Sequence, residues 1–134
     1  MDYRRVLFSL ISLTALSAGA QDTSDLKRAM IGSWRSSDGQ VVEFRADNTY
    51  RMYPKCGPET EAWKKRGIEF LPATWELVNG DHLKLTVAYQ GKSRTFDLKV
   101  AVANDEMRGT DENGQTNAQR RYVGVLPPTC PPHP

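Results

Sequence analysis

The sequence predicts an all-β protein, an eight-stranded antiparallel up-and-down barrel with a short N-terminal helix and a Pro-rich C-terminal tail. Turn residues recur about every ten positions, and the segments between them alternate apolar and polar side chains. Antiparallel hairpins need Gly, Asn or Asp at each reversal, because these residues reach positive φ or hydrogen-bond their own backbone. Closing the strands into a barrel removes the exposed edges of an open sheet. The turn segments are Asp38-Gly39, Asp47-Asn48, Asn79-Gly80-Asp81, Gln90-Gly91-Lys92, Asn104-Asp105 and Glu112-Asn113-Gly114.

Residues 1–20 predict a signal peptide. A basic n-region with Arg4 and Arg5 precedes an apolar stretch over 6–18, and small residues before Ala20 provide a cleavage site. As a helix this stretch rises only about 20 Å, short of the roughly 30 Å hydrocarbon core, so no stable membrane anchor is expected. The leader looks bacterial, and we expect a periplasmic or secreted protein.

The remaining chain predicts one domain. Removing twenty of the 134 residues leaves 114, enough for a single modest core. We place a barrel domain at 21–126 and the Pro-rich tail at 127–134. The whole chain has 18 basic and 16 acidic residues, and this balance gives no reason to expect nucleic acid as a partner.

The first elements are a short helix and three strands. Ser24 is a capping candidate for a helix over 25–31. Strands are then expected over 32–37, 40–46 and 49–55. In the second of these, alternate residues are apolar, as in a strand with one buried face.

The connection 56–67 is the longest internal one and predicts a helix of about two turns. Pro58 stands near its start, acidic residues follow, a basic run ends it, and Gly67 stops it.

Five strands complete the pattern. The first, over 68–78, contains Pro72, which marks a bulge or an edge break. The strands over 82–89 and 95–102 have the clearest period of two. Short strands over 106–110 and 115–124 follow.

Two cysteines predict a disulfide. In an oxidising compartment, Cys56 and Cys130 are expected to pair and to tie the Pro-rich tail onto the body. Proline lacks the N–H that a sheet needs, so the tail cannot be held by strand pairing. The alternative is two free thiols.

The segment Gly32-Ser33-Trp34 resembles the lipocalin family, whose signature is a G-x-W on the first strand and an arginine near the end of the last strand. Arg120 or Arg121 occupies the matching place. The resemblance covers about residues 30–124 and implies an arginine packed over Trp34. A barrel-to-tail disulfide is also common in that family. The chain is shorter than a typical lipocalin and has no clear match to the family's T-D-Y segment.

Enzyme motifs are absent from the sequence. It contains no H-E-x-x-H, C-x-x-C, G-x-S-x-G or G-x-G-x-x-G segment. The two histidines, His82 and His133, stand at a turn and in the tail, whereas a metal site needs three or four convergent ligands. We therefore predict no catalytic activity, no metal and no cofactor.

Two functional hypotheses remain. The first is a carrier that holds a small hydrophobic molecule in the barrel, unless the same side chains fill the interior. The lumen candidates are Phe44, Met52, Trp75, Leu85, Val87, Phe96, Leu98 and Val100.

The second hypothesis is a protein-binding module, such as an inhibitor of an envelope or secreted hydrolase, with a side-chain-filled barrel. Trp and Arg are enriched among interface anchors, and both occur in the 56–67 connection. The candidates for partner binding are Trp63, Lys64, Lys65 and Arg66. Alternatively, Trp63 folds onto the barrel as a lid.

Overall fold

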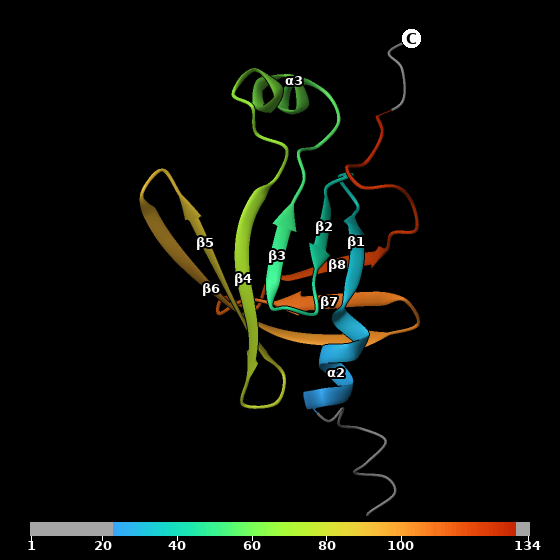
Figure 1. The fold of residues 1–134 in the computed structure, drawn as a ribbon. Helices are drawn as coiled ribbons and strands as arrows, with labels where there is room; N and C mark the ends of the chain where they lie inside the picture. Colours follow the sequence, from blue (N-terminus) through green and yellow to red (C-terminus); the bar gives the residue numbers. More distant parts are fainter. Residues whose placement is uncertain (1–22, 131–134) are drawn as a thin grey trace, which may run out of the picture.

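The computed structural model describes residues 23–130, and Figure 1 shows a sheet that closes on itself. Eight antiparallel strands pair in chain order, and the last pairs with the first. The predicted eight-stranded antiparallel barrel is confirmed. The strands are β1 (Gly32–Ser36), β2 (Val41–Phe44), β3 (Thr49–Met52), β4 (Leu71–Val78), β5 (His82–Tyr89), β6 (Lys92–Ala103), β7 (Glu106–Thr110) and β8 (Thr116–Arg121). The predicted signal peptide and the last four residues of the predicted tail lie outside the described residues.

The core occupies the inner face of the barrel. Residues directly opposite in neighbouring strands share a face, so the pairs Phe44–Tyr50 and Trp75–Leu85 both point inward. Aromatic rings fill much of this space. The ring centroid of Phe44 lies 4.9 Å from that of Tyr50 and 5.2 Å from that of Trp75, each in an edge-on arrangement.

Helix α2 (Thr23–Met30) packs across one end of the barrel (Figure 1). Leu26 and Met30 are buried in the core, and the Trp34 indole N–H donates to the Met30 carbonyl at 2.8 Å. The Lys27 ammonium donates to the Asn48 side chain at 2.9 Å, which ties the helix to the β2–β3 turn. This end of the barrel is closed.

Helix α3 (Pro58–Lys65) lies in the β3–β4 connection at the opposite end (Figure 1). The expected sequence pattern is present, with Pro58 in the first turn and Lys64 and Lys65 in the last. None of its side chains is buried, and Trp63 is half-buried. Neither α2 nor α3 is long and apolar enough to cross a membrane.

Several strand boundaries differ from the predictions. The strand predicted over 68–78 begins at Leu71, because the Ile68 N–H still donates to the Trp63 carbonyl at 2.9 Å. The strand predicted to reach 124 ends at Arg121, beyond which only the Tyr122 N–H bonds to β1, through the Ser33 carbonyl. Pro72 does not interrupt β4.

Strands two and three are also shorter than predicted, whereas β6 is longer. The segments predicted over 40–46 and 49–55 form strands only over Val41–Phe44 and Thr49–Met52. Their ends are used by the tight β2–β3 turn, in which Asn48 has a φ of 67°, and by the connection to α3. β6 begins at Lys92 and extends the hairpin with β5.

The β5–β6 hairpin extends past the closed part of the barrel. β6 has twelve residues but pairs with β7 only from Lys99 to Ala103. Its first seven residues pair with β5 alone, and the hairpin leans outward in Figure 1. The Arg66 guanidinium donates to the Tyr89 hydroxyl at 2.9 Å, so the hairpin tip is joined to the chain that leaves α3. The barrel therefore has an open end beside α3.

Candidate ligand-binding site

A small cavity lies in the closed part of the described barrel. Its volume is about 110 Å³, well below the range of roughly 300–1,000 Å³ typical of sites for drug-sized ligands. The interior is therefore filled mostly by side chains. The cavity is lined by Phe44, Tyr50, Leu83, Leu85, Leu98, Val100, Met107, Gly109, Asn117 and Gln119.

Tyr50 supplies the ionisable group of this cavity. Its side chain is buried at 5% exposure, and burial raises the pKa of the phenol well above its ordinary value. The phenol is therefore neutral at physiological pH, and the cavity wall carries no charge on this side.

A second hollow lies at the open end, on the same inner face. Its volume is about 350 Å³, within the range of small-molecule sites. Val87 and Phe96 line it. Each is the next inner-face residue toward the hairpin tip, after Leu85 on β5 and Leu98 on β6, which line the small cavity. Phe96 is 37% exposed, so an apolar surface faces this hollow from outside the core. We call this hollow the mouth; it is lined by Leu71, Val87, Tyr89, Gln90, Lys92, Arg94 and Phe96.

The eight lumen candidates fall into three groups. Four of them, Phe44, Leu85, Leu98 and Val100, line the small cavity. Two others pack in or against the core without lining either hollow, Met52 and Trp75. The last two, Val87 and Phe96, line the mouth.

Sequence reasoning missed several lining residues. Asn117 and Gln119 share the inner face of β8 with Arg121. They were missed because the lumen candidates were chosen as apolar residues, and these two are polar. Lys92 and Arg94 were missed for the same reason at the mouth. The period of two, counted outward from the apolar residues of β6, is the signal that places both basic residues on the inner face.

At the closed end, Arg121 rather than Arg120 packs on Trp34. The Arg121 guanidinium carbon lies 4.2 Å from the centre of the Trp34 ring. Its two terminal nitrogens donate to the carbonyls of Ala29, at 2.8 Å, and Ile31, at 3.3 Å. Gly32 lies beneath it, and these contacts hold β8, β1 and the end of α2 together.

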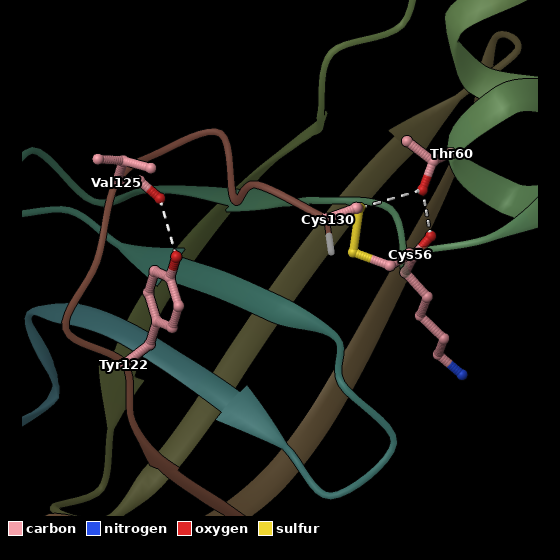
Figure 2. The surroundings of a disulfide bond; sticks show 6 residues. Cys56, Thr60, Tyr122, Val125 and Cys130 are labelled. Carbon is pink, nitrogen blue, oxygen red and sulfur yellow. Dashed lines mark hydrogen bonds between the residues drawn. A yellow bond between two sulfur atoms is a disulfide. The ribbon is translucent and has the colours of Figure 1, made fainter. Parts of the chain in front are cut away.

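Cys56 and Cys130 form a disulfide, as predicted (Figure 2). Figure 2 also shows Thr60 of α3 between the two chain segments; its hydroxyl donates to the Lys55 carbonyl and lies 3.9 Å from the Cys130 sulfur. The Tyr122 hydroxyl donates to the Val125 carbonyl at 3.0 Å. The disulfide thus ties the tail to the connection that leads into α3, and the Tyr122–Val125 bond closes a turn just before the tail.

The partner-binding candidates lie at the C-terminal end of α3 and just after it. Lys64 lines a hollow of about 510 Å³ between α3 and the tail, and Trp63, Lys65 and Arg66 do not line it. A groove of about 590 Å³ runs along the β1–β8 seam, where Arg35 and Arg120 are among the lining residues. Both hollows are larger than the mouth, but Phe96 and Val87, the apolar inner-face residues beyond the core, line neither of them.

Comparisons with protein-family models, with curated proteins and with solved structures find no match to this chain. Across residues 23–130, no group of three or more His, Cys, Asp and Glu side chains is placed to hold a metal ion. Of the two hollows on the barrel's inner face, the mouth is the larger.

Proposed function

We propose that this protein is a non-catalytic binding protein that takes a small hydrophobic molecule at the mouth of its barrel. The observation that carries the proposal is the hollow of about 350 Å³ that continues the apolar inner face beyond the core. Burial of exposed apolar surface such as that of Phe96 and Val87 supplies the driving force, at about 25 cal/mol per Å². The small cavity below contributes at most a narrow extension.

The contacts around Trp34 support a lipocalin-like assignment. An arginine near the end of the last strand lies over the tryptophan of the first, with a glycine two residues before that tryptophan. This is the arrangement that the G-x-W resemblance implies. The proposal is that the chain is a short lipocalin-like protein.

Two observations support the proposal that the protein is exported. Residues 1–20 have the basic start, the apolar stretch and the small residues before Ala20 that are typical of a cleavable leader, and the Cys56–Cys130 disulfide fits an oxidising compartment. N-terminal sequencing of protein recovered from a bacterial periplasm or medium is expected to begin at Gln21. A mature protein that retains Met1 would contradict the proposed signal peptide.

Ligand binding can be tested by native mass spectrometry and tryptophan fluorescence with a panel of lipids and pigments. A saturable complex is expected. Phe96→Glu places a carboxylate in the mouth and should weaken that complex at least about tenfold, because the charge must be desolvated against an apolar ligand. The matched control is Thr95→Glu, the same charge on the neighbouring residue of β6, whose side chain is on the outer face.

The outcomes separate cleanly. Loss of binding in Phe96→Glu and retention in Thr95→Glu support a site at the mouth. No saturable ligand for the wild-type protein, or equal effects of the two substitutions, would overturn it.

The second candidate function is the protein-binding module, an inhibitor of an envelope or secreted hydrolase. The small size of the inner cavity, about 110 Å³, favours this candidate, because a filled barrel is a rigid scaffold. Trp63 is half-buried beside the exposed Lys64, Lys65 and Arg66. Inhibition of purified envelope hydrolases by the wild-type protein, lost in Trp63→Ala, would favour it over the carrier.

A further inference from the structure

We infer that the ligand at the mouth is an anionic amphiphile, with an alkyl chain on the apolar wall and a carboxylate or phosphate head held by Lys92 and Arg94. This inference rests on the proposed function and adds the chemical class of the ligand. The juxtaposition that carries it is a pair of inward-facing cations next to exposed inward-facing apolar side chains.

Strand pairing places both cations on the inner face. In the β5–β6 ladder Lys92 lies opposite Tyr89 and Arg94 lies opposite Val87, and opposite residues share a face. The side chains of all four residues line the mouth. The outer-face residues of the same stretch of β6 do not line it, so the charges belong to the hollow and not to the convex surface.

The charges of Lys92 and Arg94 are not neutralised within the part of the chain that the structure describes. The seven residues that line the mouth include two cations and no carboxylate. No salt bridge joins Lys92 or Arg94 to an acidic residue within 23–130; Arg94 instead lies 4.8 Å from the ring centre of Phe96. Arg66, which donates to the Tyr89 hydroxyl, adds a third positive charge beside the mouth. The mouth therefore has a positive potential that an anionic ligand would complement.

The inner-face side chains of β6 change from basic at the hairpin tip to apolar toward the core. Counting inner-face residues from the hairpin tip, Lys92 and Arg94 are followed by Phe96, Leu98 and Val100. From Arg94 to Val100 the chain advances six residues, roughly 20 Å in an extended strand. A ligand with a charged head at the tip and an alkyl chain toward the small cavity matches this order. An arginine guanidinium can bind carboxylate or phosphate through two parallel hydrogen bonds.

Inward-facing charges also protect unpaired strand edges, and the first half of β6 has such an edge. If protection of the edge is their only role, the head group of a bound ligand will not matter. Head-group preference therefore distinguishes the two roles.

The experiment measures affinities by isothermal titration calorimetry for four linear ligands of ten carbon atoms each: decanoate, decyl phosphate, decanol and decylamine. We expect decanoate and decyl phosphate to bind at least about tenfold more tightly than decanol, a factor equal to about 1.4 kcal/mol. Decylamine should bind more weakly than decanol. Comparison of the two anions tells whether a carboxylate or a phosphate is preferred.

Substitutions then test whether Lys92 and Arg94 bind the head group of the ligand. Arg94→Gln and Lys92→Gln should each weaken decanoate binding about fivefold to twentyfold and leave decanol binding unchanged, which also shows that the variants are folded. Arg108→Gln is the matched control, since Arg108 is on the outer face of β7 and pairs with Glu106. NMR chemical-shift changes with decanoate are expected at Val87 and Phe96.

Equal binding of decanoate and decanol would overturn the anionic inference and leave the proposed function standing. Tight binding of decylamine, or shift changes confined to the tail, would also overturn it. Failure of all four ligands to bind, together with the lipid and pigment panel, would instead overturn the proposed function.

Discussion

Arg121, a partly buried side chain on the inner face of β8, joins several parts of the described barrel. It lies over Trp34 and donates to two carbonyls at the end of α2, and its Nε lies 3.3 Å from the Asp105 carboxylate. Arg121→Gln removes the cation–π contact and the charged donors, and we expect a loss of roughly 2–4 kcal/mol in the free energy of unfolding. Urea denaturation measures it. Arg120→Gln, on the exposed neighbour, should change stability by no more than about 0.5 kcal/mol; equal losses would contradict the special role of Arg121.

Gly32 is required by its backbone and by its neighbour. Its φ is +129°, where residues with a Cβ are strained, and an added Cβ would lie 2.9 Å from the Arg121 Nη1. Gly32→Ala is expected to cost roughly 1–3 kcal/mol in thermal or urea unfolding. Gly109→Ala serves as the control, because a Cβ there meets its nearest atom at 3.7 Å and projects into the small cavity. A neutral Gly32→Ala would contradict both the backbone strain and the close approach of Arg121.

Between elements, the Asp38–Lys55 ion pair joins the β1–β2 turn to the start of the connection that contains α3. The carboxylate and ammonium are 2.6 Å apart, and the hydrogen bonds from Lys55 and then Ser36 lower the pKa of Asp38 to about 2. A carboxyl whose pKa is lowered by folding contributes stability above its unfolded pKa, 3.8, and loses it as the pH falls toward 2. Because the pair is largely exposed, the contribution is expected to be under about 1 kcal/mol.

The prediction for this pair concerns the acid limb of the stability curve. Between pH 4 and pH 2, the stability difference between wild type and Asp38→Asn should shrink toward zero, as followed by urea unfolding. Lys55→Gln should remove a similar pH-dependent increment. A difference that persists unchanged at pH 2 would show that the substitution acts through something other than the ion pair.

For the whole molecule, the disulfide is the one covalent constraint within the described residues. It joins residues 74 apart in the sequence. Replacing both cysteines with serine should lower the free energy of unfolding by about 2–4 kcal/mol, with the entropy of the unfolded chain as the main cause in the loop-closure model. Unfolding of wild type with and without a thiol reductant measures the same quantity. Decanoate binding should survive, since no tail residue lines the mouth; superimposable unfolding curves would refute the stabilising role.

The barrel could be predicted because its signals are local. A turn residue at positive φ, such as Asn48 or Asn104, can be recognised from its immediate neighbours in the sequence. The alternation along β5 likewise lies within eight consecutive residues. Strand ends were less accurate, since the end of β8 at Arg121 depends on how far its partner β1 extends. Strand pairing puts the apolar candidates of β5 and β6 on the inner face, but alternation along a strand cannot tell a filled lumen from an open mouth.

The sequence by itself determined the order of the strands, the face that each presents to the core and the pairing of the two cysteines expected after export. Only the tertiary structure decided that Arg121 and not Arg120 covers Trp34, and that Lys92 and Arg94 stand beside exposed apolar side chains. The physical reason is that these features arise between segments far apart in the chain. β6 has twelve residues and its neighbour β7 has five, so the first seven residues of β6 have no partner in β7. The length of one strand cannot be predicted from the sequence of the other.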